Sequence, residues 1–466
     1  MVYRCVRWVA LGLSVVLGAC TDPASELAPP LPQDPLVKVY FNQNQAAEYT
    51  NPYRSQTRRG DNLEQIIIDT IAQADRSLDL AVQELRLPKI AEALVRRHEA
   101  GVKVRVILEN QYSRGWSDYS SDEIAELDSR KRNRYDAFRQ FADRDGDAEV
   151  SDREASQADA VAIVRDAGIP IIDDTADGSK GSGLMHHKFA IADGRHLIVS
   201  SANFTNSGIH GDIDKPASRG NANHLFAIDA PELASIFEAE FDLMWGDGLG
   251  GEPDSQFGLQ KPFRPVRDVV LGETLVSVKF SPTSRTLDWD KSTNGAIARA
   301  LERIDTSANL ALFVFSEQQL VDVLRTQHRQ GATIKALIDP SFAYRSYSEG
   351  LDMLGVALPD RRCRYEKNNR PWQDAITTVG VPILPPGDKL HHKFAVIDDR
   401  MVVTGSHNWS NAANRTNDET LLIVQSPTVV AHFTREFDRL YENATLGVTS
   451  TLQRKIEQKQ RTCQSN

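Results

Sequence analysis

Residues His186–Asp193 read HHKFAIAD, and residues His391–Asp398 read HHKFAVID. Both stretches match the pattern His-x-Lys-x-x-x-x-Asp, and their apolar, β-branched content predicts two strands. Because side chains two residues apart share one face of a strand, His186 and Lys188 lie on one face and His187 on the other. The same alternation holds in the second copy, where Lys393 follows the first histidine by two. The chain therefore carries the same polar strand twice.

A second polar cluster follows each motif at the same spacing. It reads SSAN at Ser200–Asn203 and GSHN at Gly405–Asn408. The surrounding order of elements recurs as well: VKVYF at Val37–Phe41 is echoed by VSVKF at Val276–Phe280, and each is followed by helix, strand, helix, glycine turn and strand. This alternation predicts parallel β-sheet with helices on its faces. The predicted ranges are helices 63–74 and 297–304, strands 77–82 and 309–315, helices 89–100 and 319–330, and strands 103–108 and 333–338.

Two matching aromatic stripes close the halves. FxxEFDxxW at Phe237–Trp245 corresponds to FxxEFDxxY at Phe433–Tyr441, and aromatic residues four apart form a helix face typical of core packing. Between the halves, Gly246–Pro265 is rich in Gly, Pro and polar residues, which predicts a linker. We expect a signal peptide at 1–19, a linker at 20–36, a first half at 37–246 with an insertion at about 112–165, a linker at 247–273, a second half at 274–446 and a C-terminal tail at 447–466.

The composition places the chain among globular proteins. Of its 466 residues, 41% are hydrophobic and 25% are charged, which argues against disordered, collagen-like and multispan membrane classes. The formal net charge of -10 argues against broad, salt-driven binding to duplex nucleic acid, which needs an extended basic surface. A local basic cleft remains open.

The N-terminus has the pattern of an export signal. Arg4 and Arg7 precede an apolar run, Trp8–Leu17, and small residues lead to Cys20. This segment resembles the lipobox of bacterial lipoproteins, in which the cysteine is lipidated; the alternative is a plain cleaved signal. No later run reaches the roughly 20 apolar residues that cross a bilayer, so Cys20 would be the membrane attachment. We expect an exported lipoprotein on the periplasmic face of a bacterial membrane or on the cell surface, and Thr21 favours the outer membrane.

Signal cleavage leaves two thiols, Cys363 and Cys463. Cysteines in an oxidising compartment often pair. Spacing alone does not show whether their Cα atoms come within bonding distance, so the pairing stays open.

The residues of the two motifs are those that phosphodiester cleavage needs. One neutral imidazole can attack phosphorus, and a second can protonate the leaving oxygen. Lys188, Lys393, Asn203 and Asn408 can stabilise charge on the nonbridging oxygens, and this scheme requires no metal. A lone His-x-Lys is more often an exposed polar strand, but two complete copies at matched places in a repeat argue for chemistry.

With these motifs the chain resembles the phospholipase D superfamily from about Val37 to Tyr441. The resemblance implies an α/β fold of two similar halves, each a mixed, mostly parallel sheet flanked by helices, related by pseudo-two-fold symmetry, with the histidines meeting at one phosphate site. It implies a phosphohistidine intermediate, with His186 as nucleophile and His391 as general acid, although the residues themselves do not order the two. It also implies supporting roles for a further set: Asp193, Asp398, Ser201 and Ser406.

One departure concerns the segment after each polar cluster. The second half has Asn417-Asp418-Glu419, and members of the superfamily often carry a glutamate near the site. The first half has Asn221-Ala222-Asn223 at the matching place. We therefore expect Glu419 to be functional in an asymmetric site.

The insertion contains a calcium-binding pattern. DRDGDAEVSDRE at Asp143–Glu154 has oxygen ligands at the spacing of an EF-hand loop, between predicted helices at 121–141 and 151–167. Ala148 stands where Gly usually allows a positive φ, at a cost of about 1 kcal/mol. The alternative is a solvated acidic loop. The expected Ca²⁺ ligands are Asp143, Asp145, Asp147, Glu149, Ser151 and Glu154.

Three functions fit these features. The lipid anchor and acidic charge favour a phospholipase D-type enzyme that hydrolyses phospholipid or transfers its head group. A secreted nuclease would use the same chemistry, and a calcium-stabilised surface binding protein is the alternative without catalysis. Aromatic and arginine side chains in two equivalent loops are expected to flank the cleft but do not decide the substrate, and we expect a monomer. They are Tyr112, Arg114, Trp116 and Tyr119 in the first half and Tyr344, Arg345 and Tyr347 in the second.

Overall fold

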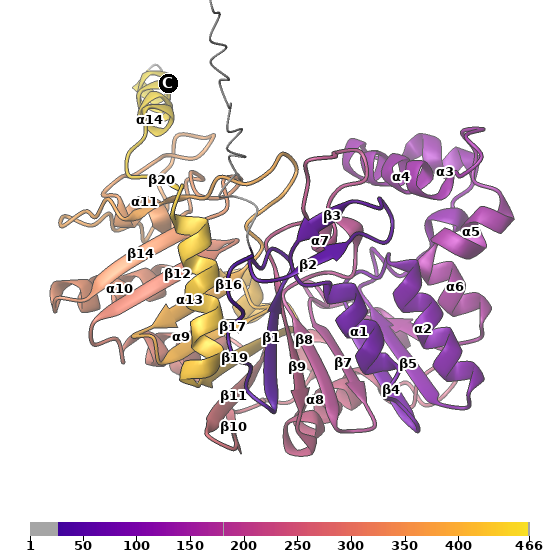
Figure 1. The fold of residues 1–466 in the computed structure, drawn as a ribbon. Coiled ribbons are helices and arrows are strands. Elements are labelled where there is room, and N and C mark those ends of the chain that lie inside the picture. The colour runs from indigo at the N-terminus through magenta and orange to yellow at the C-terminus, as the bar shows by residue number, and fades with distance from the viewer. Residues whose placement is uncertain (1–26, 180, 465–466) are drawn as a thin grey trace, which may run out of the picture.

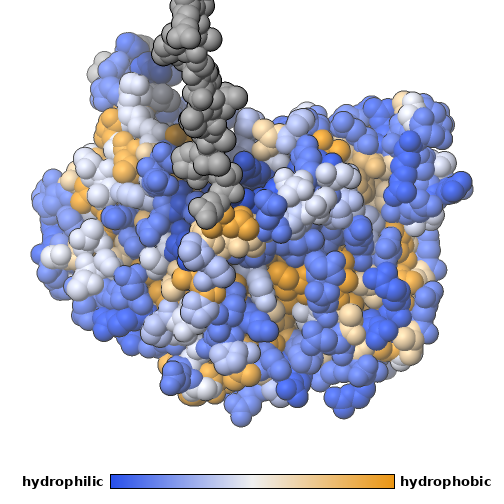
Figure 2. Space-filling view, viewed as in Figure 1, coloured by the Kyte–Doolittle hydropathy of each residue, from blue (hydrophilic) through white to orange (hydrophobic). Residues whose placement is uncertain are grey.

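The computed structural model describes residues 27–179 and 181–464, so the expected signal and Cys20 lie outside the described residues. Two β-sheets stand side by side, each covered by helices (Figure 1). Within the described ranges, none of the helices combines the length and apolar character that membrane crossing requires. Hydrophilic residues cover most of the face drawn in Figure 2, with hydrophobic patches near its middle.

The first half forms a seven-stranded sheet in the order β1-β9-β8-β7-β4-β5-β6. The strands that the sequence predicted at 37–41, 77–82 and 103–108 are confirmed at those bounds. Their apolar side chains alternate into cores on the two sheet faces. The strands are β1 (Val37–Phe41), β4 (Ser77–Val82), β5 (Lys103–Leu108), β6 (Ile171–Asp173), β7 (Lys188–Ala192), β8 (His196–Ser200) and β9 (His224–Asp229).

The second half repeats this order as β11-β19-β17-β16-β12-β14-β15, with β10 and β20 added at the edges. The strand predicted at 309–315 begins and ends earlier, at 307–312. The strands are β10 (Arg267–Leu271), β11 (Thr274–Ser281), β12 (Ser307–Leu312), β14 (Thr333–Ile338), β15 (Val379–Val381), β16 (Lys393–Ile397), β17 (Met401–Gly405), β19 (Glu419–Gln425) and β20 (Thr445–Leu446).

The α/β fold of two similar halves is confirmed, with one difference in strand direction. In the first sheet only β4-β5 and β5-β6 pair in parallel, and in the second only β12-β14 and β14-β15 do. The sheets are therefore mixed but mostly antiparallel. The reason is local: the motif strands β7 and β16 are joined to β8 and β17 by turns too short for a crossover helix, so each pair is a hairpin.

The helices begin and end near their predicted places. Those of the first half are α1 (Leu63–Ile71), α2 (Pro88–Glu99) and α8 (Pro231–Trp245), and those of the second are α9 (Thr293–Leu301), α10 (Gln318–Arg329) and α13 (Pro427–Tyr441). The aromatic stripes on α8 and α13 pack into a core, as predicted, and the structure shows that this core is shared by both halves. Phe433 of α13, for example, meets Phe41 and Phe226 from the first half and Phe394 from the second.

The insertion forms four helices where two were predicted. They are α3 (Ser121–Glu126), α4 (Ser129–Ala142), α5 (Asp152–Ala158) and α6 (Ala160–Asp166). Each predicted helix breaks at an aspartate, Asp128 or Asp159, whose side chain caps the backbone N–H groups that follow it. Figure 1 shows α3 and α4 along the upper edge of the first half.

The C-terminal tail is a helix held by a disulfide. In α14 (Ser450–Gln464), Cys463 bonds to Cys363 with Cα atoms 5.4 Å apart, which answers the question that spacing left open. The remaining short elements are β2 (Glu48–Thr50), β3 (Thr57–Arg59), β13 (Phe315–Ser316), β18 (Trp409–Ser410), α7 (Asn206–Ile209), α11 (Glu349–Met353) and α12 (Asn411–Arg415).

Candidate active site

The two motif strands begin where the halves meet. Just before β7, Met185 forms a parallel bridge with Asp418 of the second half, and just before β16, Leu390 forms one with Ala222 of the first. The backbone N–H of His186 donates to the Asp418 carbonyl at 2.9 Å. Two short cross-half bridges thus bring both motifs to one interface.

Each motif histidine is held by a side chain from the opposite half. His186 Nδ1 lies 2.6 Å from Glu419 Oε2, and His391 Nδ1 lies 2.9 Å from Asn223 Oδ1. Asn223 occupies the position in the first half that Glu419 occupies in the second. Sequence reasoning missed Asn223, although its place in the repeat was the signal. The site is therefore symmetric in position and asymmetric in charge.

The serines of the polar clusters hold these two orienting groups. Ser201 donates its hydroxyl to Asn223 Oδ1 at 2.8 Å, and Ser406 donates to Glu419 Oε2 at 2.8 Å. The Asn223 amide nitrogen donates to the Gly208 carbonyl at 2.9 Å, so its oxygen is the acceptor that faces His391. The histidine Nδ1 then carries the proton, and Nε2 is left to face a substrate.

The motif lysines are buried beside the histidines. Lys188 Nζ donates to the His186 carbonyl at 2.6 Å, and Lys393 Nζ donates to the His391 carbonyl at 2.5 Å. Burial lowers the pKa of Lys188 to about 7. Burial and the nearby Lys188 cation hold the pKa of Lys393 well below its ordinary value. The charge of Lys188 thus disfavours a charge on Lys393, and an anion bound near both would relieve that repulsion.

Both motif histidines are neutral at pH 7 in this environment. Burial, followed by the charges of Lys188 and Lys393, holds the pKa of His186 well below its ordinary value. Burial, Lys393, Lys188 and His186 do the same to the pKa of His391. Lysine charges from both halves therefore lower the pKa of each histidine. A neutral imidazole with a free Nε2 is competent as a nucleophile.

The two motif aspartates lie elsewhere. Asp193 accepts the backbone N–H groups of residues 75–77, and Asp398 accepts those of residues 305–307. Each stands seven residues after its histidine, at the opposite end of the strand and roughly 20 Å away. These hydrogen bonds stabilise the turn that precedes β4 or β12, and none of them reaches a motif histidine.

The two asparagines of the polar clusters have unsatisfied side-chain oxygens in the described part of the chain. The Asn203 and Asn408 side-chain oxygens are buried without a hydrogen-bond partner among the described residues. A third histidine, to which sequence reasoning assigned no role, directly precedes Asn408: His407 Nε2 lies 2.9 Å from Asn294 Oδ1, and its Nδ1 is buried and unpartnered within the described part of the chain. The first half has Ala202 at that place.

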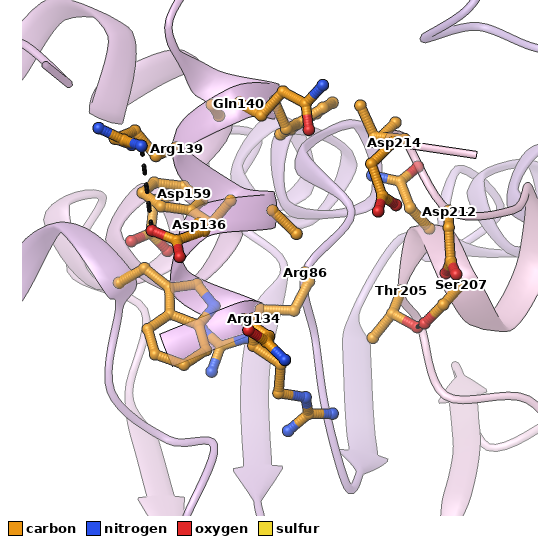
Figure 3. A pocket seen from close by; sticks show the side chains of 18 of the residues that line it. Arg86, Arg134, Asp136, Arg139, Gln140, Asp159, Thr205, Ser207, Asp212 and Asp214 are labelled. Carbon is orange, nitrogen blue, oxygen red and sulfur yellow. Dashed lines mark hydrogen bonds and ion pairs between the residues drawn. The ribbon is translucent and has the colours of Figure 1, made fainter. Parts of the chain in front are cut away.

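A cavity of about 930 Å³ lies under the insertion, near Lys188 of the first motif. It is lined by Glu84, whose neighbour Gln83 contacts Lys188, and by residues 205–207, which follow the first polar cluster. Figure 3 shows Arg86 and Arg134 on one side of the cavity and Asp212 and Asp214 on the other. Neither motif histidine lines it.

Arginine side chains lie over the aromatic loop residues of the first half. Arg86 lies over Trp116, Arg134 over Tyr112 and Arg114 over Tyr119. In the second half, Tyr347 is 40% exposed, and the carbonyl of Tyr344 accepts from Lys455 of α14. Trp116 alone of the seven predicted loop residues lines the cavity.

The EF-hand-like loop brings three of the six predicted Ca²⁺ ligands together. Asp143, Asp145 and Asp147 each offer a carboxylate oxygen within 4.8 Å of the others. Glu154 instead accepts the backbone N–H groups of Arg144 and Ser151 as a helix cap, and the Ser151 hydroxyl donates to it. The exposed Glu149 is outside the cluster. The strain anticipated at Ala148 is present, since its φ is 68°.

The chain is similar to known families and proteins in both halves. The profile described as "Cardiolipin synthase, PLD-like domain" matches residues 67–245 and 297–441, one range in each half. Mitochondrial cardiolipin hydrolase from mouse is 27% identical over 158 residues, which are 34% of this chain and 61% of that protein. The human protein of that name is 28% identical over 158 residues, 34% of this chain and 54% of its own. The chain thus matches little more than half the length of these curated relatives.

A solved structure resembles nearly the whole chain. Phosphatidylserine synthase from Haemophilus influenzae Rd KW20 superposes with a TM-score of 0.56 at 12% identity, covering 94% of this chain and 93% of that one. At this identity the likeness concerns the fold alone. Both the profile and the superposition extend over the two halves.

Proposed function

The chain belongs to the cardiolipin synthase, PLD-like domain family, and from this membership we propose that it is a phosphodiesterase of the phospholipase D type. The observation that carries the proposal is the pair of cross-half bonds, His186 to Glu419 and His391 to Asn223, which leaves two Nε2 atoms for one phosphate.

In the first step, His186 Nε2 attacks phosphorus. An N–P bond forms, the P–O bond to the leaving alcohol breaks, and the alcohol oxygen takes a proton from His391. His391 is neutral in the free protein, but a bound phosphodiester raises its pKa by adding a negative charge. Lys188 and Lys393 stabilise the charge that grows on the nonbridging oxygens. In the second step His391 takes a proton from water, the water oxygen forms a bond to phosphorus, and the N–P bond to His186 breaks.

The unequal orienting groups favour this order of the two histidines. A phosphorylated imidazole is cationic, and the Glu419 carboxylate beside His186 stabilises that cation more than an amide would. The neutral Asn223 beside His391 leaves its imidazolium a better proton donor. The asymmetry thus supports His186 as nucleophile and His391 as general acid.

We propose phospholipid as the substrate. The curated relatives bear the name cardiolipin hydrolase, and the expected lipid anchor at Cys20 would hold the enzyme against a membrane as an exported lipoprotein. The cavity beside the site gives room for the remainder of a large substrate. A secreted nuclease is the second candidate, because the same site chemistry serves both.

A structural Ca²⁺ in the insertion is a separate proposal. The three clustered carboxylates fit a hard cation, and Glu154 would have to leave its cap to complete the ligand set. Asp143 and Ala148 of this loop also line the cavity, so the ion would order one cavity wall.

The function is tested by assaying purified protein on phospholipid vesicles, single-stranded DNA and duplex DNA, with His186→Ala as control. We expect release of a head group from vesicles, lost by at least about 1000-fold in the control. Cleavage of DNA alone would transfer the proposal to the nuclease. Equal signals from wild type and control on every substrate would refute a phosphodiesterase.

A further inference from the structure

The linker between the halves contains a lysine whose side chain is 0% exposed. Lys261 Nζ lies 2.5 Å from Glu240 Oε1 of α8 and 2.8 Å from Asp418 Oδ1, just before β19. From the same linker, the Gly258 backbone N–H lies 3.0 and 3.1 Å from the two Asp418 oxygens, and Arg264 Nε lies 3.0 Å from Glu240 Oε2. A segment predicted as a spacer thus supplies three groups to a buried polar network.

A lysine is almost never fully buried without a partner, because removing its charge from water costs several kcal/mol. Here the carboxylates of Glu240 and Asp418 offset that cost. Burial alone would raise the pKa of Glu240, yet Lys261 and Arg264 lower it to about 2. Glu240 is therefore ionised throughout the physiological range. Such a buried ion pair fixes the positions of the groups that it contacts.

The network holds both chain neighbours of Glu419. On one side, Asp418 contacts Lys261 directly. On the other, the Thr420 hydroxyl lies 2.8 Å from His187 Nδ1, and His187 Nε2 lies 3.5 Å from Glu240 Oε1. His187 is also the chain neighbour of His186. One buried Lys261–Glu240 pair therefore connects to both members of the His186–Glu419 dyad.

The backbone of Asp418 adds a second connection. Its N–H donates to the Leu184 carbonyl at 2.9 Å, and its carbonyl accepts from the His186 N–H at 2.9 Å. These two bonds fix the start of the motif strand against Asp418. A shift of the Asp418 side chain would therefore be passed directly to His186.

Among the residues that the structure describes, the other half shows no such connection. Glu436, the counterpart of Glu240, contacts His392 at 2.9 Å, but its cation is Arg439 from its own helix α13. Ala222 stands where Asp418 stands, so there is no carboxylate for a cation to hold. The Lys261–Glu240–Asp418 network (the clamp) is therefore confined to the side of the site that carries the Glu419 carboxylate.

We propose that Lys261 is a positioning residue, which acts through Asp418 and Glu240 to set the geometry of the His186–Glu419 dyad. The proposal rests on the function proposed above. It gives the linker a role in catalysis: a near-attack geometry held by a remote group is sensitive to displacements of about 1 Å, which can cost roughly 100-fold in rate.

The test compares Lys261→Met with Arg439→Met, its matched control in the other half, on bis(p-nitrophenyl) phosphate. Both variants leave a buried carboxylate less well paired and should lose thermal stability. We expect Lys261→Met to lower kcat by about 10- to 100-fold with KM within about twofold, and Arg439→Met to keep kcat within about threefold. Equal kcat losses in the two variants, or a change confined to KM, would overturn the proposal.

A second variant separates positioning from stability. In Lys261→Met the unpaired Asp418 carboxylate lies beside the dyad and raises the pKa of His186, so the acidic limb of kcat/KM moves to higher pH. In Lys261→Met/Asp418→Asn the charges balance again: the limb and the melting temperature return toward wild type, but kcat stays low because the clamp is absent. Recovery of kcat in the double variant would show that Lys261 does not position the dyad.

The proposal is also testable without turnover. Nitrogen-15 NMR of the histidines, assigned with His186→Ala, reports the Nδ1–H bond to Glu419. Wild-type protein inactive on every phosphodiester would refute the proposed function, while the NMR still decides the role of Lys261. A folded Lys261→Met with an unchanged His186 signal would overturn the positioning role, and a shifted signal, unchanged in Arg439→Met, would support it.

Discussion

Replacing Glu419 with glutamine tests the asymmetry of the site. Glu419 is 0% exposed, and its carboxylate accepts from three donors: His186 Nδ1 at 2.6 Å, Ser406 Oγ at 2.8 Å and Asn417 Nδ2 at 3.1 Å. Glutamine keeps the shape of the side chain but removes the charge. The effect therefore isolates how much the carboxylate stabilises a cationic His186.

The size of the loss follows from hydrogen-bond energies. A hydrogen bond to a charged group contributes about 1.5–3 kcal/mol, and a neutral one about 0.5–1.5 kcal/mol. The difference, about 1–2 kcal/mol, applies when His186 becomes cationic and corresponds to roughly 5- to 30-fold in kcat. This is a lower bound, because a glutamine that turns its N–H toward His186 also forces the wrong tautomer.

The assay is rapid-quench release of p-nitrophenol from bis(p-nitrophenyl) phosphate. The matched variant is Asn223→Asp, which gives His391 a carboxylate, raises its pKa and moves the alkaline limb of the rate to higher pH. Glu419→Gln should slow the burst that forms the phosphoenzyme. A burst within twofold of wild type in folded Glu419→Gln would refute the reasoning.

Three further predictions concern pH, the motif aspartates and calcium. Lys188 is charged below its pKa of about 7, so kcat/KM should fall as pH rises through about 7, beyond the fall caused by loss of the His391 proton; the alkaline limb should become shallower in Lys188→Arg, and an unchanged limb in that variant contradicts this. Burial raises the pKa of Asp398, but the N–H groups that donate to its carboxylate lower that pKa by more, so it lies below the unfolded value of about 3.9. The stability that Asp398 contributes is therefore present above the unfolded value and lost as pH falls. Asp398→Asn should lower the melting temperature at pH 7 and leave kcat intact, whereas a lower kcat with an unchanged melting temperature would place Asp398 in the site. Ca²⁺ at about 100 times its Kd should add about 2.7 kcal/mol to stability, measured by chemical denaturation, and Asp145→Asn should abolish the gain; no shift at millimolar Ca²⁺ rules the ion out.

The repeat made most of the fold predictable. Strands 37–41, 77–82, 103–108 and 333–338 have the predicted bounds, because short apolar runs between polar residues leave little freedom in where a buried strand begins; Gly101 and Gly331 also mark turns before the last two. Strand direction was harder. The sequence between β7 and β8 shows a tight turn, but the parallel expectation came from the helix alternation elsewhere. The breaks at Asp128 and Asp159 depend on side-chain caps that periodicity does not show.

The site was predictable as a set of motifs but not as a set of contacts. The two His-x-Lys pairs followed from spacing, whereas the cross-half partners depend on how the halves pack. Asn223, His407 and Lys261 lie outside the motif, and Glu240 was interpreted as packing because its helix stripe is apolar. For the motif aspartates, the sequence pattern predicted a place in the site that their contacts do not show. They belong to the pattern, yet their contacts lie at the far strand ends.

Trapping the phosphoenzyme tests the central claim, that one composite site uses both histidines. Acid-free quenching of a burst, followed by mass spectrometry, should find one phosphoryl group per chain on His186, none in His186→Ala, and an accumulated phosphoenzyme in His391→Ala with a p-nitrophenyl leaving group. Label on His391, or single variants that each keep about half of the wild-type rate, would mean two separate sites and contradict the account.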